Sequence, residues 1–284
     1  MNIKVFRYDP LVDSYPRYET YKLPMVENKV IVDYLERLRL DLGVSGLAYR
    51  WFCGVKKCGV CGMNANRRPV LGCWELVRTD LLLEPLPNFP IIKDLVVDIS
   101  EYENIVLGVN PFVVRDKPVR KFPEKISHKM MEKVHVLQGC FECYLCTSAV
   151  PIKSLTPAKK IVYMGVGPAA LTKLAKVALD PRDAYDRREV VQTSGVENYL
   201  DYDELATVCP MGINIREHVI KPLITKYNLT AGNADKVLSE LIFVRSPEMA
   251  AFVNIHSNEK RRLVAEGILR FDRMLEDVEI YKLA

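Results

Sequence analysis

Three cysteines spaced three residues apart, Cys140, Cys143 and Cys146, constrain this chain more than any other feature. At that spacing a tight helical turn brings the three sulfurs to one face, and soft thiolates placed in this way wrap one iron–sulfur cube. The run therefore predicts three ligands of a 4Fe-4S cluster. A zinc knuckle or three buried core cysteines is the alternative, and structural zinc sites usually arrive as paired C-x2–4-C units.

The fourth ligand of this cube has to come from a distant part of the chain. In the run C-x2-C-x2-C-x3-C-P the last cysteine serves a second cluster. Here Val150 occupies that position, and Pro151 still follows it. The final Cys-Pro of a two-cluster ferredoxin fold closes the first cube, so Cys209, which precedes Pro210, is the predicted fourth ligand.

A second set of four cysteines fits the plant-type pattern C-x4-C-x2-C…C of 2Fe-2S clusters. Its members are Cys53, Cys58, Cys61 and Cys73. The first three are each followed by a glycine, and a missing Cβ lets the backbone N–H groups of such a loop approach bridging sulfides closely. Structural zinc is again the alternative. All eight cysteines are then assigned, four to each cluster.

Composition limits the remaining classes of function. A length of 284 residues suggests about two domains, and a net charge of +4 is too small to indicate a nucleic-acid partner. No signal peptide opens the sequence, and no apolar run reaches the ~18 residues of a transmembrane segment. We therefore expect a cytoplasmic protein, in which spaced cysteines are metal ligands and not disulfides.

Hydrophobic periodicity predicts the order of elements. Residues 3–8 and 18–23 alternate like half-buried strands, and the apolar residues between positions 30 and 40 recur at helical spacing. Two strands and a helix are how a β-grasp ferredoxin begins, and from about Tyr102 the pattern turns helical. We expect an α+β fold with a β-grasp, plant-type 2Fe-2S ferredoxin domain over 1–105. An all-α, bacterial-ferredoxin-like 4Fe-4S domain would cover 106–230, and a helical C-terminal extension 231–284.

Residues 50–73 and 84–98 resemble the iron–sulfur subunit of succinate dehydrogenase and fumarate reductase. Cys209-Pro-Met-Gly-Ile-Asn214 likewise matches that family's Cys-Pro-x-Gly-x-Asn. The resemblance implies a non-catalytic electron-transfer subunit of an oxidoreductase complex. Its partner would be a flavoprotein subunit that carries FAD, with the 2Fe-2S cluster nearest the flavin. No residue of this chain is predicted to act as an acid, base or nucleophile.

The sequence departs from that family at a third centre, a 3Fe-4S cluster. The positions of its ligands hold Val150, Tyr199 and Leu205, none of which binds iron as a thiolate does. The nearby quinone pocket also lacks its tryptophan, and Leu200 replaces its histidine. We therefore expect the usual quinone exit to be lost, with an apolar or aromatic plug in the vacated space. A further redox subunit or a soluble electron carrier would then be the second partner, and partner subunits would provide any membrane association.

Some questions stay open at this stage. The same two clusters would also suit a heterodisulfide-reductase-like or hydrogenase-linked complex with a different flavoprotein. The substrate, the direction of electron flow and the oligomeric state have no signature in the sequence.

Three further features are weaker signals. Residues 160–170 imitate a strand and a G-x-G-x-x-A dinucleotide turn, but no second apolar strand follows, which disfavours nucleotide binding. His128 and His135 precede the cube's cysteines, and we interpret them as solvated or loosely packed histidines and not as ligands. Apolar residues between 263 and 278 recur at helical spacing, which predicts an amphipathic helix that docks on its own domain or binds a partner.

Overall fold

The computed structural model describes residues 1–13, 15–119, 124–155 and 161–229, with the strand residues 242–243, 250–251, 269–275 and 278–283. The chain divides into two compact units. One comprises Met1–Ile99, Cys143–Val162 and Lys236–Ala284, and the other comprises Ser100–Glu142 and Tyr163–Asp235. The first unit thus combines the amino-terminal residues with two later segments of the chain.

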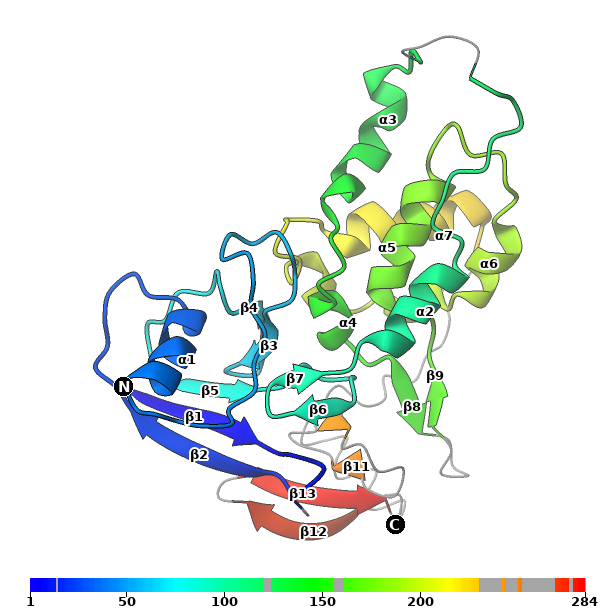
Figure 1. The fold of residues 1–284 in the computed structure, drawn as a ribbon. Coiled ribbons are helices and arrows are strands. Elements are labelled where there is room, and N and C mark those ends of the chain that lie inside the picture. The colour runs from blue at the N-terminus through cyan, green and yellow to red at the C-terminus, as the bar shows by residue number, and fades with distance from the viewer. Residues whose placement is uncertain are drawn as a thin grey trace. The chain divides into compact units, whose positions relative to one another are not determined.

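A five-stranded mixed sheet forms the frame of the first unit (Figure 1). Its strands in spatial order are β2 (Arg17–Lys22), β1 (Asn2–Arg7), β5 (Leu81–Glu84), β3 (Gly62–Ala65) and β4 (Arg68–Leu71). The pair β1–β5 is parallel, and the other pairs are antiparallel. The two strands predicted from alternation are confirmed as β1 and β2.

Helix α1 (Ile31–Leu40) packs its apolar face on this sheet. The carboxylate of Asp33 accepts a hydrogen bond from the Val30 backbone N–H at 3.1 Å, which satisfies a donor at the start of the helix. The core between helix and sheet contains no cysteine. Its buried members are Ile3, Val5, Leu23, Ile31, Tyr34, Leu35, Leu38, Leu47, Met63, Ala65, Val70, Val77, Leu81, Leu83 and Leu95.

Short elements complete the first unit. After the sheet come β6 (Ile91–Lys93) and β7 (Val96–Val97), which pair with each other. From the later segment come the single helical turn α4 (Leu145–Ser148) and the paired strands β8 (Lys153–Leu155) and β9 (Ile161–Tyr163). Helix α4 carries part of the cysteine run, so that run contributes directly to the unit that contains the sheet.

The second unit is built from helices: α2 (Ser100–Gly108), α3 (His128–His135), α5 (Gly167–Ala178), α6 (Arg188–Thr193) and α7 (Lys221–Tyr227). A π-helical turn, Arg216–Ile220, leads directly into α7. The buried Arg187 donates to both carboxylate oxygens of Asp183, at 2.6 and 3.0 Å, and to the carbonyls of Asn110 and Phe112. This guanidinium ties the loop after α2 to the start of α6.

Two predictions about the carboxy-terminal half are wrong. The range 106–230 is not all-α, because β8 and β9 lie within it, and Ile161-Val-Tyr163 is rich in residues that favour strands. The range 231–284 contains β10 (Ile242–Phe243), β11 (Ala250–Ala251), β12 (Leu269–Leu275) and β13 (Val278–Leu283). A helix across 269–278 is therefore excluded, because β12 and β13 pair antiparallel. The rest of that predicted helix, 263–268, lies outside the described residues.

Candidate iron–sulfur sites

The loop after Cys53 surrounds that sulfur with backbone donors. The N–H groups of Val55, Lys57 and Cys58 donate to Cys53 Sγ at 3.5, 3.3 and 3.4 Å. The chain can turn so tightly because Gly54 and Gly59 adopt φ values of 67° and 76°, which a residue with a Cβ rarely adopts. A sulfur that accepts three such bonds is stabilised as a thiolate, the form that binds iron.

The other three cysteines of this set make contacts in pairs. Strands β3 and β4 form a hairpin that begins after Cys61 and ends before Cys73, so the two thiols meet at its open end. The backbone hydrogen bonds lower the pKa of Cys53 to about 6, and Cys58 also contacts its sulfur. Burial raises the pKa of Cys61 to about 12. Cys58 thus contacts Cys53, and Cys73 contacts Cys61, and these two thiol pairs with the N–H donors at Cys53 are compatible with a 2Fe-2S cluster.

Exposed aromatic and aliphatic side chains surround this loop. Phe52 is 80% exposed, Trp74 57% and Trp51 44%, and Val55 and Val60 are also exposed. Large apolar side chains gathered on a surface mark sites of protein contact. This group is called the aromatic rim below.

The four predicted ligands of the cube fall in different units. Cys143 and Cys146 lie at α4 in the first unit. Cys140 and Cys209 are neighbours in the second unit, where burial and the nearby Cys209 raise the pKa of the Cys140 thiol. Within the described residues, no group of three or more His, Cys, Asp or Glu side chains is arranged to hold a metal ion. The ligand sets therefore stay predictions.

The side chains at the three positions of the family's additional centre are all buried. Val150, Tyr199 and Leu205 are each 0% exposed. Burial raises the pKa of Tyr199, which keeps its phenol protonated. Each of these side chains is packed in the interior of its own unit, and the apolar or aromatic plug stays a prediction.

The structure also describes the two histidines and the glycine-rich turn that the sequence analysis considered. His128 and His135 lie at the two ends of α3 and are exposed, which confirms the interpretation of solvated histidines. Strand β9 is followed by a turn and α5, as the glycine pattern suggested. The next described element is α6, so no second strand completes a dinucleotide-binding unit there.

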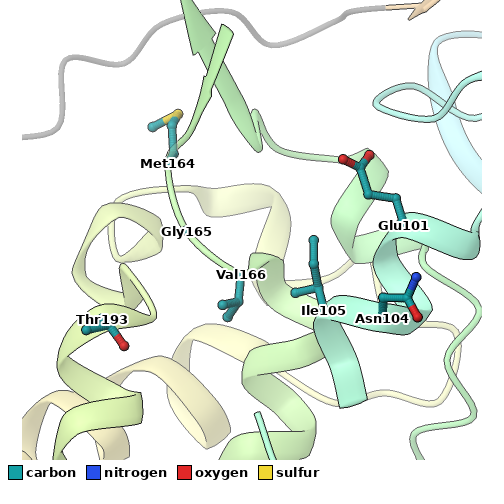
Figure 2. Close-up of a pocket in the computed structure, with 7 residues that line it drawn as sticks. All are labelled: Glu101, Asn104, Ile105, Met164, Gly165, Val166 and Thr193. Carbon is teal, nitrogen blue, oxygen red and sulfur yellow. The ribbon is translucent and has the colours of Figure 1, made fainter. Parts of the chain in front are cut away.

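A surface cavity of about 560 Å³ lies in the second unit beside this turn. Figure 2 shows Asn104 and Ile105 of α2 on one wall, Gly165 and Val166 of the turn on another, and Thr193 of α6 opposite. None of the eight cysteines lines this cavity.

Two contacts near the cysteines had no signal in the sequence. A Cβ on Gly62 would lie 3.0 Å from Leu86 Cδ1, 3.4 Å from Leu145 Cδ2 and 3.6 Å from the Cys143 carbonyl oxygen. The side-chain position of the residue after Cys61 thus faces the backbone of the second cysteine run. The second contact joins Asn88 to the carboxyl end of α4. Both depend on residues about 60 to 80 positions apart, beyond the reach of local patterns.

Among the helices of the described ranges, none combines the length and the apolar character that a membrane crossing requires.

Comparison with known proteins identifies relatives for most of the chain. The model of a 2Fe-2S iron–sulfur cluster binding domain matches residues 2–104. The fumarate reductase iron–sulfur subunit of Mycobacterium tuberculosis is 32% identical over 250 residues, which cover 85% of this chain and 96% of that protein. One subunit of the fumarate reductase (CoM/CoB) of Methanothermobacter marburgensis is 30% identical over 224 residues, 78% of this chain and 43% of that longer protein.

A solved structure, the Mycobacterium smegmatis Sdh1 complex in the apo form, contains a chain of similar fold. The TM-score is 0.67 at 23% identity, and the match covers 80% of this chain and 94% of that one. Both the sequence and the fold thus match over most of their length. The chain belongs to the family of fumarate reductase iron–sulfur subunits.

Proposed function

We propose that this chain is the electron-transfer subunit of a flavin-dependent complex of the fumarate reductase or succinate dehydrogenase type. It would pass electrons between a flavoprotein subunit, which holds FAD, and a second redox partner. Cys53, Cys58, Cys61 and Cys73 would hold a 2Fe-2S cluster, and Cys140, Cys143, Cys146 and Cys209 a 4Fe-4S cluster. These clusters supply one-electron chemistry, and the reaction at carbon belongs to the flavoprotein.

The contact at Gly62 carries this proposal. Cys61 belongs to the first set of ligands and Cys143 to the second, and a Cβ placed on Gly62, the residue after Cys61, would lie 3.6 Å from the Cys143 carbonyl oxygen. Two redox groups held by these segments would be close neighbours inside protein. This proximity is what an electron-transfer chain needs, and a pair of structural zinc sites does not need it.

The aromatic rim supports contact with a flavoprotein at the first site. It surrounds the loop with Cys53 and Cys58, where an electron would enter or leave the 2Fe-2S cluster. Apolar docking there would exclude water around that cluster. The burial of Val150, Tyr199 and Leu205 supports the further proposal that a third centre is absent.

The name of one relative suggests what kind of protein the second redox partner is. The relative from Methanothermobacter marburgensis is a subunit of a fumarate reductase (CoM/CoB). This name suggests that the electron source of the present chain is a thiol-linked redox subunit, as in heterodisulfide-reductase-like complexes. The chain spans 43% of that relative's length. A soluble carrier is the other candidate.

Iron and sulfide analysis of the anaerobically purified complex tests the cluster assignment. We expect about six irons per chain, two from one cluster and four from the other, with electron paramagnetic resonance signals of both on reduction. About nine irons would show a third centre, and a colourless protein with bound zinc would refute electron transfer. Co-purification with a flavoprotein, followed by an assay of fumarate reduction, then separates this proposal from a complex with another substrate.

A further inference from the structure

The loop between β5 and β6 contains a buried asparagine with an unusual backbone. Asn88 follows Pro87, is 1% exposed and has a φ of 71°. Proline followed by a residue of positive φ is the pattern of a type II turn, in which Asn or Gly takes the second central position. The turn is tight and preset by Pro87, so it aims the Asn88 side chain in a fixed direction.

The Asn88 amide binds the end of α4. Its Nδ2 donates one hydrogen bond to the Thr147 carbonyl at 2.7 Å and another to the Val150 carbonyl at 2.8 Å. Both amide hydrogens are therefore used. The last carbonyls of a helix have no partner within the helix, and Asn88 satisfies one of them at Thr147 together with the Val150 carbonyl just beyond the helix.

The next residue, Phe89, holds the other end of the same segment. Its ring packs edge-on against Tyr144, with ring centroids 5.9 Å apart and planes at 68°. Tyr144 lies between Cys143 and Cys146 and has a φ of 58°, a left-handed conformation that costs energy for a residue with a side chain. External contacts must maintain this backbone, because a single helical turn is too short to be stable alone.

We propose that Asn88 is a positioning residue for the second cluster. Its amide fixes the carboxyl end of α4, and Phe89 fixes the amino end, so that Cys143 and Cys146 are presented in the geometry that a cube requires. Through these two neighbours the loop after the sheet controls ligands that lie more than 50 positions further along the chain. The inference depends on the proposed assignment of Cys143 and Cys146 as 4Fe-4S ligands.

The test compares three variants in the intact complex. Asn88→Asp is nearly isosteric but replaces a donor with a carboxylate that faces two carbonyl oxygens. Asn88→Gly keeps the positive φ and removes the amide. Asn228→Asp makes the same chemical change at an exposed asparagine, also of positive φ, that ends α7. The measurements are iron per chain and the midpoint potential of each cluster, followed by electron paramagnetic resonance.

We expect Asn88→Asp to shift the midpoint potential of the 4Fe-4S cluster, or to reduce iron from about six toward two per chain, while the 2Fe-2S potential stays unchanged. Asn88→Gly should change the same cluster in the same way but less, and Asn228→Asp should change neither. If Asn88→Asp does not assemble, Asn88→Gly decides the outcome.

The failures of the two proposals differ. A wild-type complex with two irons per chain would refute the 4Fe-4S assignment, and the role of Asn88 with it. A wild-type complex with six irons, whose two potentials both survive Asn88→Asp or Asn88→Gly unchanged, would overturn the role of Asn88 alone. Equal shifts of both clusters would show a general structural role and would also overturn it.

Discussion

Glu84 is a buried carboxyl group on β5, 2% exposed. The Tyr18 hydroxyl donates to it at 2.5 Å and Asn64 Nδ2 at 3.3 Å. Burial nevertheless dominates and raises the pKa of Glu84 above its ordinary value. The folded state therefore keeps a proton that the unfolded chain releases near pH 4.3, and stability falls as pH rises between the two pKa values.

We predict that Glu84→Gln stabilises the protein increasingly as pH rises through this window, by up to about 1.4 kcal/mol per pH unit. A glutamine has no charge to bury, and Asn64 Oδ1, which accepts no hydrogen bond among the described residues, can accept from it after the amide rotates. Urea midpoints of both proteins across about pH 4 to 8 measure the difference.

A matched control for this pH effect is the exposed Glu217. The hydrogen bond from Lys221 lowers the pKa of Glu217, so its contribution to stability is lost as pH falls, and Glu217→Gln should show the opposite trend with pH. A constant difference between wild type and Glu84→Gln at every pH would contradict the shifted pKa of Glu84.

Gly195, in the helical unit, lies against the turn at Met164 and Gly165, which leaves no space for a side chain. A Cβ there would lie 2.3 Å from the Met164 carbonyl oxygen and 2.9 Å from Gly165 Cα, and φ is +66°. We predict that Gly195→Ala lowers the free energy of unfolding by about 2–5 kcal/mol, from backbone strain plus overpacking. Gly43→Ala has a similar φ but open space around its Cβ, and it should cost only about 1–2 kcal/mol. Equal losses in thermal denaturation would show that packing at Gly195 is unimportant.

At the scale of elements, the β3–β4 hairpin has an unfavourable residue in its turn. Asn66 and Arg67 connect the strands with φ values of 49° and 64°, the pattern of a type I′ turn, which prefers Asn-Gly. We predict that Arg67→Gly raises the free energy of unfolding by about 1 kcal/mol. Arg68→Gly, one residue later within β4, should instead lower it by about 0.5–1 kcal/mol. A chemical denaturation series in which both variants lose stability would rule out the type I′ turn as the source of strain.

The elements differ in how far the sequence determines them. β1, β2 and α1 follow from local alternation and helical spacing because one face of each is buried against the same core. The predicted helix near 269–278 failed because Phe271 and Leu275, four positions apart, fit both a helical and a strand period, and β12 has a register shift between Phe271 and Arg273 that breaks its alternation. The cysteine spacings predict seven of the eight ligands, the Cys-Pro pattern predicts Cys209, and both ligand sets stay predictions. The contacts of Gly62 and Asn88 could not be predicted, since they depend on the packing of distant segments.

At the scale of the whole molecule, the predicted ligands lie outside the core that stabilises the sheet. The core between α1 and the sheet contains no cysteine, and the loop from Cys53 to Cys61 has exposed apolar side chains and little buried surface of its own. Local stability depends on such buried contacts. The sheet should therefore keep its fold without iron, whereas the loop depends on the cluster that it binds.

Iron removal by anaerobic chelation, followed by amide hydrogen exchange, tests this division. We predict that amides between Cys53 and Cys61, and those of α4, lose most of their protection, while the amides of β1, β2 and β5 keep theirs. The reason is that metal binding supplies the folding energy of the loops, and burial of the apolar core supplies that of the strands. Reconstitution with iron and sulfide is the control, and it should restore protection in the loops. If the three strands instead lost protection together with the loops, sheet and clusters would form one cooperative unit, and the core alone would be insufficient to fold the sheet.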